Sequence, residues 1–553
     1  MKNFYFMTFF LCAALSAQAT VKPRPGHPAY AKAQNNSSVV VSGTEEGDDV
    51  SRASRRKIGS QQNAPLKAVG SPKVPVILVQ FSDKKFTSGL GTTDDGSGNT
   101  VQKECLTPED SLIVNEFFTK FCNGDAESEY YKGHGSFGSI REYFRDQSLG
   151  QFTPEFVLIG PVTLSKSYSY YGKNSGDNND IRISEFYKDA IKEAQKYFTN
   201  WAQFDNDGNN TVDMAFFLYA GRGENDSNET DENTIWPQER PIGGTIGTTK
   251  YGCYACCNEV YDDEPDGIGV FVHELSHALG LPDFYDNNYV AFGLDYWDIM
   301  DSGCYNLGGK VPCNYSAYER DFMGWKDIIT LEKGVKTELT LKPISQGGDA
   351  YKIVNPQNSN EYYVIENRQT ETWDTYIGNG TSRTKMHGLM VAHVDYKSSI
   401  WANNYSINGD VNHQHMTIIP ASGELITYSN ISSQEEYNNY MAAMRAHLFP
   451  GCAGVTQLTG AQAYVYTATG DTPHQMNQPL TNIVEKEDGT ITLTFCGDDA
   501  TAIESLFANT EESVPVYNLA GMQIGTTTIQ YGKPTQLPDA SGIYIVKGKK
   551  YIK

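Results

Sequence analysis

Residues 270–285 read VFVHELSHALGLPDFY and contain the pattern H-E-x-x-H-x-x-G-x-x-D. Residues four apart share one face of an α-helix, so the imidazoles of His273 and His277 can reach one cation with Glu274 beside it. The apolar residues around them predict a buried helix, in which two imidazoles and a carboxylate without a metal would be costly polar groups. Imidazole and carboxylate are ligands that zinc prefers. The segment therefore predicts a zinc site.

The third ligand of this site depends on how the helix ends. A catalytic zinc takes three protein ligands and keeps a fourth position for water. Gly280 can adopt the left-handed conformation that ends a helix and Pro282 cannot continue it, so Asp283 can turn back toward His277. Glu319, in SAYERDFMGW, is the competing candidate, because some zinc peptidases take a glutamate from a later helix. The bend favours Asp283.

Glu274 is interpreted as a catalytic group and not as a ligand. Bound zinc lowers the pKa of water to about 7, and a neighbouring carboxylate can then take the proton and pass it to a leaving amine. The sequence thus predicts hydrolysis of peptide bonds. The alternative, from another class, is a surface adhesion protein that keeps this scaffold without turnover and uses its 35 tyrosines for contact. The intact Glu274 argues against that alternative.

These motifs are similar to those of the immune inhibitor A-like secreted metallopeptidases, a metzincin-related group of bacterial enzymes. The likeness runs from about residue 74 to about residue 497 and includes PVILVQFSD (75–83), FDNDGNNTVDMAFFLYAGRG (204–223) and WDIMDSG (297–303). The resemblance implies zinc ligation by His273, His277 and Asp283 and catalysis by Glu274. WDIMDSG also resembles the methionine turn of metzincins, which implies that Met300 forms an apolar floor under the zinc site.

The loop DNDGNNTVD (205–213) alternates oxygen donors around a glycine, as in the first part of a calcium-binding loop. Asp205, Asp207, Asn209 and Asp213 could ligate calcium, with a backbone carbonyl at Thr211. The bidentate glutamate of a complete EF-hand is missing, because the following MAFFLYAG reads as a buried strand. An isolated calcium loop and a simple acidic turn both remain open.

The predicted fold class is α+β, a metzincin-like zinc peptidase catalytic domain followed by β-sandwich-type domains. We expect a signal peptide at 1–19, a flexible pro-segment at 20–71, the catalytic domain at 72–330, a β-rich domain at 331–500 and a C-terminal β sorting domain at 501–553. Short alternating runs such as TELTLKPI, EYYVIE, LMVAHVDY and TITLTF predict the strands of the β-rich domain, and Asp488-Gly489 predicts a hairpin turn. His393, on one of these strands, is expected to be a satisfied core histidine.

The first residues have the pattern of a secretory signal, with a lysine, an apolar run and the small residues Ala17 and Ala19 before a cleavage site. Residues 20–71 are rich in Pro, Ser, Asn and Gln, and the basic stretch at 52–57 is a target for activating proteolysis, with a solvated linker as the alternative. Asp48 or Asp49 could occupy the open metal position before activation.

The last fifty residues resemble the sorting domain used in type IX secretion, through VYNLAG (516–521) and GIY (542–544). The resemblance implies that the type IX machinery is a partner, that the chain crosses the outer membrane and that it is secreted or held at the cell surface. A simple terminal β-sandwich is the alternative.

Composition excludes some functions. A net charge of −23 argues against nucleic acid as a partner, since phosphate binding needs a basic surface, and it favours weak steering toward cationic peptides. No stretch beyond the signal predicts a transmembrane segment. Nine cysteines follow Cys12, and in an exported chain disulfides are expected rather than a structural zinc at the Cys253-Cys256-Cys257 cluster.

Overall fold

The computed structural model describes residues 19–25, 64–125, 135–176, 179–226, 233–378, 386–402, 407–467 and 470–496, together with the strands of the C-terminal unit between 512 and 552. The predicted signal peptide up to residue 18, the acidic pair at 48–49 and the basic stretch at 52–57 lie outside these residues.

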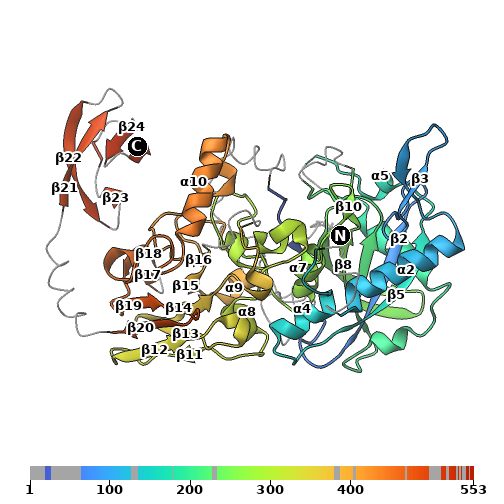
Figure 1. Ribbon diagram of the computed structural model, residues 1–553, viewed down its shortest axis with the longest axis horizontal. Helices are drawn as coiled ribbons and strands as arrows, with labels where there is room; N and C mark the ends of the chain where they lie inside the picture. Colours follow the sequence, from blue (N-terminus) through green and yellow to red (C-terminus); the bar gives the residue numbers. More distant parts are fainter. Residues whose placement is uncertain are drawn as a thin grey trace, which may run out of the picture.

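A six-stranded sheet forms the centre of the first unit, with strand order β1-β7-β8-β6-β2-β5 (Figure 1). The strands are β1 (Ala19–Thr20), β2 (Lys73–Gln80), β5 (Glu155–Thr163), β6 (Val212–Tyr219), β7 (Gln238–Ile246) and β8 (Thr249–Asn258). Strands β5, β2, β6 and β8 are parallel, whereas β7 runs antiparallel to β8 and β1 antiparallel to β7.

Helices cover both faces of this sheet, which explains why its strands are apolar without alternation. α2 (Pro108–Asn123), α4 (Ile140–Gln147) and α7 (Gly269–Ala278) share one core cluster with Val76 and Phe216. α6 (Ile183–Ala194) shares the other cluster with Ile77 and Phe217 on the opposite face. Neighbouring residues of one strand thus face different cores, and α7 is held on one of these faces.

The second unit is rich in strands, as its alternating runs predict. One sheet has the order β11-β13-β14-β15-β16, made of β11 (Ile329–Thr330), β13 (Tyr351–Asn355), β14 (Asn358–Arg368), β15 (Gly388–Asp395) and β16 (Met416–Ile418). The other has the order β12-β20-β19, made of β12 (Thr337–Leu341), β20 (Ile491–Phe495) and β19 (Leu480–Glu485). The expected turn lies between β19 and β20, with Gly489 at φ 78°.

Smaller elements of this unit include two further strands and a helix. Strands β17 (Tyr464–Thr467) and β18 (Gly470–Gln475) pair with each other, and the sequence did not predict the helix α10 (Gln434–Arg445). His393 on β15 is buried and its Nε2 lies 2.7 Å from Glu361 Oε1, so it is the partnered core histidine that was expected.

The C-terminal residues form a separate five-stranded sheet with the order β23-β22-β21-β24-β25 (Figure 1). Its strands are β21 (Glu512–Asn518), β22 (Gln523–Gln530), β23 (Lys533–Pro534), β24 (Ile543–Val546) and β25 (Lys549–Ile552). A small cluster around Val516 and Val546 is its own core. Val546 pairs with Lys549 in an antiparallel pair of strands, whose connecting turn lies outside the described residues.

The expected disulfides are not formed. All nine described cysteines are free thiols, and seven of them are buried. Cys253 and Cys257 face one core and Cys256 the other, because successive residues of β8 point to opposite faces of the sheet. The cluster that looked like a framework for cross-links instead packs as small apolar residues.

Two parts of the segment expected to be flexible are packed against the first unit. The backbone N–H of Leu66 donates to Ala278 O, at the end of α7, and Trp325 Nε1 donates to Ala68 O. Residues 21–25 are also largely buried. Parts of residues 20–71 therefore pack against the first unit, in a segment that was expected to be flexible.

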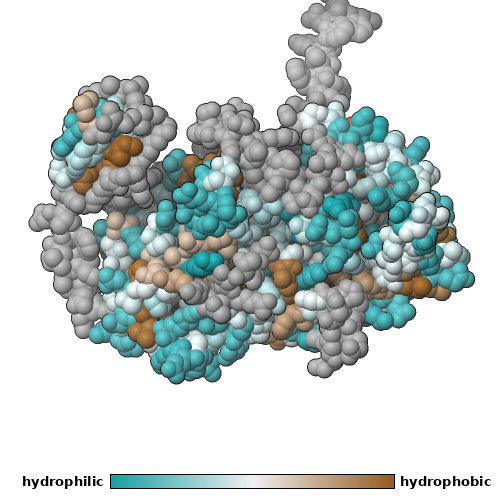
Figure 2. All heavy atoms as spheres, turned by 45° about the horizontal axis from the view of Figure 1, so that its top comes forward, coloured by the Kyte–Doolittle hydropathy of each residue, from teal (hydrophilic) through white to brown (hydrophobic). Residues whose placement is uncertain are grey.

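The described surface seen in Figure 2 is mostly hydrophilic, with apolar side chains in small groups. Within the described ranges, every helix is either too short or too polar to span a bilayer.

Candidate metal centre and peptide groove

A glycine lies at each end of α7, the helix that carries the motif. A Cβ at Gly269, the first residue of α7, would stand 1.8 Å from Cys304 O, so only glycine permits this close approach. At the other end Gly280 has φ 105° and its N–H donates to His277 O. The predicted stop is confirmed, and Pro282 and Asp283 follow in the turn.

The turn brings Asp283 against both histidines. Asp283 Oδ1 lies 3.1 Å from His273 Nε2 and 3.3 Å from His277 Nε2, and the two Nε2 atoms are 3.2 Å apart. All three side chains have an exposed fraction of 0%. Among the described residues these three form a group whose ligand atoms meet within 4.8 Å, and Glu319 does not belong to it.

The tautomers of the two histidines are fixed by their other nitrogens. His273 Nδ1 lies 2.8 Å from Ile299 O and His277 Nδ1 lies 2.8 Å from Leu281 O. Since a carbonyl oxygen only accepts, both Nδ1 atoms carry the proton and both Nε2 atoms present lone pairs. Two imidazole nitrogens and a carboxylate oxygen facing one another in a buried pocket form a donor set that a cation can bridge. The residues present therefore fit a zinc ion.

Asp283 and Glu274 differ in their electrostatic surroundings. Burial acts to raise the pKa of Asp283, but positive charge and hydrogen bonds from His277 and His273, which arise when these rings are protonated, outweigh it and lower the pKa below its ordinary value. Burial raises the pKa of Glu274 well above its ordinary value, and the carboxylates of Asp283 and Glu239 raise it further. The pKa values of the two carboxyl groups in this pocket thus differ in direction. The lowered pKa of Asp283 suits a metal ligand, and the raised pKa of Glu274 suits a group that carries a proton.

Glu274 is poised for contact with a peptide. Its Oε1 accepts a hydrogen bond of 3.0 Å from the backbone N–H of Val21, while its buried Oε2 has no hydrogen-bond partner among the described residues. One carboxylate oxygen therefore faces a peptide strand, and the other is left for a group that the protein itself does not supply.

The other candidate, Glu319, has a structural role. It lies at the third position of α8 (Ala317–Phe322), and its Oε2 accepts from the backbone N–H and the hydroxyl of Ser316 in a capping box. Burial raises its pKa well above the ordinary value, and the nearby Asp298 raises it further. Glu319 holds the start of a helix beside the site.

The turn with Met300 packs beneath α7. Met300 is fully buried, it follows the carbonyl of Ile299 that fixes His273, and its own carbonyl accepts from the N–H of Phe284. The turn therefore contacts the metal-site residues from two directions, through the ring of His273 and through the chain after Asp283.

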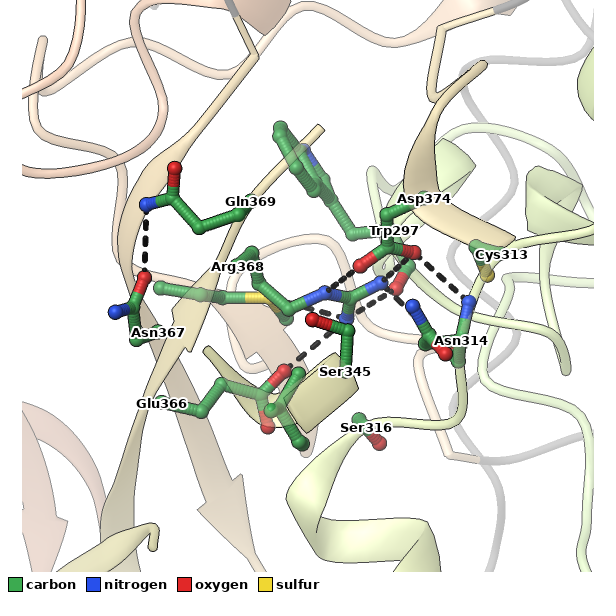
Figure 3. A network of polar contacts seen from close by, with 12 residues as sticks. Trp297, Cys313, Asn314, Ser316, Ser345, Glu366, Asn367, Arg368, Gln369 and Asp374 are labelled. Carbon is green, nitrogen blue, oxygen red and sulfur yellow. Dashed lines mark hydrogen bonds and ion pairs between the residues drawn. The ribbon is translucent and has the colours of Figure 1, made fainter. Parts of the chain in front are cut away.

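Arg368 on β14 anchors the same turn from the second unit (Figure 3). Its guanidinium donates to Asp374 at 2.7 and 2.8 Å, to Glu366 at 3.1 Å and to the carbonyl of Trp297 at 3.1 Å. Burial opposes its charge, but Asp374 and Glu366 outweigh burial and raise the pKa of Arg368. The β-rich unit is thus bonded to the turn that supports His273.

Residues 19–25 lie beside α7 (Figure 1), and the N–H of Val21 contacts Glu274 of that helix. β1 extends the sheet by pairing with the edge strand β7, with Thr20 opposite Gln238. Beyond β1, Trp236 Nε1 donates to Val21 O, and the N–H of Arg24 donates to Asn225 O. Two prolines favour extended backbone around Lys22 and Arg24, but the sequence contains no alternating apolar run that would predict this strand.

The acidic loop at 205–213 gathers three of its four expected side chains. The carboxylates of Asp205, Asp207 and Asp213 offer atoms within 4.8 Å of one another, and Asn209 Nδ2 donates to Asp207 instead of offering its oxygen there. Burial raises the pKa of Asp213 to about 6, opposed by hydrogen bonds from Asn206. The loop is compact, and its carboxylates point to one place.

A buried helix with two histidines four apart, a glutamate between them and an aspartate that turns back defines a metallopeptidase type of site. Residues 61–327 match the family model described as immune inhibitor A peptidase M6, catalytic domain. The matching family model is of the metallopeptidase class that the sequence predicts.

Two curated relatives align with about half of this chain. Immune inhibitor A from Bacillus thuringiensis subsp. alesti is 24% identical over 310 residues, which are 49% of this chain and 43% of that protein. The pre-pro-metalloprotease PrtV from Vibrio cholerae serotype O1 (strain M66-2) is 28% identical over 310 residues, which are 49% of this chain and 33% of that protein. The match spans less than half the length of either relative.

Proposed function

We propose that this chain is a secreted zinc-dependent endopeptidase, in which His273, His277 and Asp283 hold the ion and Glu274 carries the proton. The observation that carries the proposal is the meeting of two imidazole lone pairs with a carboxylate oxygen beside a glutamate. The names of the relatives, immune inhibitor A and a pre-pro-metalloprotease, support the same reading. They do not favour the alternative of a binding protein without turnover.

The residues of the site have separate tasks in this reaction. Zinc, when bound, polarises the scissile carbonyl and lowers the pKa of water. Glu274 Oε2 takes a proton from the attacking water, and Glu274 then delivers a proton to the amide nitrogen as the C–N bond breaks. The raised pKa of Glu274 suits a group that must hold a proton between these steps. Strand β7 aligns the substrate by backbone pairing, as it aligns β1.

The test is casein hydrolysis by the purified full chain with and without a chelator, together with Glu274→Gln. Loss of general base catalysis lowers the rate by about 10²–10⁴-fold, and the variant should keep its zinc. Glu116→Gln, on an exposed part of α2, is the matched control and should retain full activity. Undiminished hydrolysis by Glu274→Gln would refute the mechanism.

For the fold, we propose that the first unit is metzincin-like. Support comes from a mostly parallel sheet in which β7, next to the edge strand β1, runs antiparallel to its neighbours, and from the buried turn of Met300 beside α7. We also propose that the second unit is of β-sandwich type, because its five-stranded and three-stranded sheets share one core, with Ile353 and Ile365 on one and Leu341 and Leu493 on the other. The position of Met300 as an apolar floor remains a proposal.

Export and maturation belong to the same proposal. The type IX sorting role of residues 501–553, the signal peptide at 1–19 and activation by cleavage near residues 52–57 are inferred from sequence patterns. Mass mapping of both ends of the protein recovered from culture medium tests all three. Calcium at Asp205, Asp207 and Asp213 is proposed as a structural ion, supported by the convergence of these carboxylates.

A further inference from the structure

The strand at residues 20–25 lies in the register of a substrate. β1 is antiparallel to the edge strand β7, and the backbone nitrogen of Val21 lies 3.0 Å from Glu274 Oε1. Glu274 is the group that gives a proton to the leaving nitrogen in the proposed reaction, so Val21 N occupies the place of that nitrogen. The bond between Thr20 and Val21 thus corresponds to a scissile bond. Val21, Lys22, Pro23 and Arg24 are then the first to fourth residues after it.

The side chain of Lys22 enters a buried acidic subsite. Its Nζ lies 2.9 Å from Asp301 Oδ1, with side-chain exposures of 5% and 0%. Asp295 and Asp286 add to the negative field at this lysine, and its ammonium stands 5.8 Å from the centre of the Tyr285 ring. Three carboxylates around one ammonium form a subsite that favours a cation over an apolar or acidic side chain.

The side chain of Arg24 enters a second subsite with the features of an arginine pocket. Its Nη2 lies 2.7 and 2.6 Å from the two oxygens of Asp266, and both side chains are almost fully buried. The guanidinium carbon lies 3.9 Å from the centre of the Tyr261 ring and 4.6 Å from that of Tyr305. A carboxylate and two aromatic faces around a guanidinium match the geometry that arginine, and not lysine, satisfies.

The backbone of the strand is also bound by the groove. Tyr305 donates its hydroxyl proton to Lys22 O, and it accepts a hydrogen bond of 3.0 Å from Asn225 Nδ2. Asn225 O in turn accepts from the N–H of Arg24. Backbone contacts of this kind fix the register of any extended peptide, so the side-chain pockets alone decide which peptide fits.

We propose that the groove on the carboxyl side of the scissile bond selects basic peptides, with a lysine in the Asp301 subsite at the second residue and an arginine in the Asp266 subsite at the fourth. Residues 21–25 of this chain are the bound example. The inference rests on the proposed hydrolytic function for its register, but the two subsites stand on contacts that do not involve the metal. The acidic character of the whole chain favours the same substrates through steering.

The inference is tested with a separate peptide added to the full chain, because the chain's own strand and an added peptide compete for one groove. The full chain with Lys22→Met and Arg24→Met loses both anchors, and its activity toward a general peptide should rise at least tenfold over the parent. Lys192→Met, an exposed lysine on α6, is the matched control and should not change activity.

Binding is then measured on the double variant by fluorescence anisotropy with labelled acetyl-TVKPRP, which has the sequence of residues 20–25. We expect its Kd to be at least 30-fold lower than that of acetyl-TVMPMP. Asp266→Asn should remove the preference for arginine at the fourth residue, tested with acetyl-TVKPMP, and leave the preference for lysine. Tyr261→Leu should weaken the same preference without removing a buried carboxylate, so a folding failure of the first variant does not decide the result.

The outcomes separate the subsites from the reaction. Equal affinity for the basic and methionine peptides, or binding of neither by a chain that still hydrolyses casein, overturns the inference. Selective binding by a chain that hydrolyses nothing after zinc loading supports the two subsites while refuting the proposed enzyme. Enrichment of lysine and arginine at the second and fourth positions after the cut, in products of a peptide library, supports both.

Discussion

Replacing Arg368 with methionine should be among the most damaging single changes in this chain. The substitution keeps much of the side-chain length and removes the charge that two buried carboxylates share. Arg368 has an exposed fraction of 0%, and Asp374 and Glu366 have 1% and 3%. Loss of the guanidinium therefore leaves two negative groups in the interior without their cation.

The expected loss of unfolding free energy follows from this burial. Breaking a buried ion pair by removing one partner costs about 3–5 kcal/mol, because an uncompensated charge stays buried. Arg368 also donates to the carbonyls of Trp297 and Asn314, which lose a charge-assisted bond each. We expect a loss in the upper half of that range. Arg145→Met, whose side chain is 49% exposed beside Asp146, should cost less than about 1 kcal/mol.

Urea denaturation followed by tryptophan fluorescence measures this difference, because Trp297 and Trp373 lie in the same region. The triple variant with Arg368→Met, Asp374→Asn and Glu366→Gln should recover most of the lost free energy, since no stranded charge remains. A free energy of unfolding for Arg368→Met within 1 kcal/mol of the parent would show that the network carries no such energy. A triple variant that is less stable than Arg368→Met would lead to the same conclusion about the network.

Three further predictions concern single carboxyl groups. After dialysis, Asp283→Ala should retain less than a tenth of the parent's zinc, measured by mass spectrometry of the metal. Glu319→Gln should retain the parent's zinc content. Equal zinc loss in both variants would contradict the ligand assignment. Burial raises the pKa of Asp180 from its ordinary 3.8 to about 7. The folded state therefore keeps a proton that the unfolded state releases, and the free energy of unfolding falls by about 4 kcal/mol between pH 4 and pH 7. Asp180→Asn should remove this fall in urea titrations. An unchanged dependence of the unfolding free energy on pH would refute the assignment. Calcium should raise the urea midpoint of the parent and leave that of Asp213→Asn unchanged, and an equal rise in both would exclude the loop as the binding site.

The convergence of His273, His277 and Asp283 was predictable because its geometry is local. His273 and His277 are one helical turn apart, and Gly280 and Pro282 determine where the helix ends, so the approach of Asp283 followed from chain stereochemistry. The strands were also predictable, because each carries its pattern of burial within a few residues. Local rules suffice where the partners are near in the chain.

The parts that the sequence did not predict depend on distant partners. Lys22 meets Asp301 and Arg24 meets Asp266 across more than 240 residues, and nothing in a proline-rich stretch indicates which groove will accept it. The prediction of disulfides was wrong for a related reason. Spacing along the chain suggested pairing, but Cys253 and Cys256 face different sides of β8 and never approach as a pair.

One turn connects the proposed metal site to the proposed peptide subsites. Between residues 297 and 305 it presents Ile299 O to the ring of His273, Asp301 to the lysine subsite and Tyr305 to the arginine subsite. A shift of this turn would move a metal ligand and both subsites together. Because Arg368 of β14 bonds to the first carbonyl of the turn, the β-rich unit takes part in holding all three positions. The second unit is therefore expected to be necessary for selectivity as well as for stability, although none of its residues lies among the proposed metal ligands.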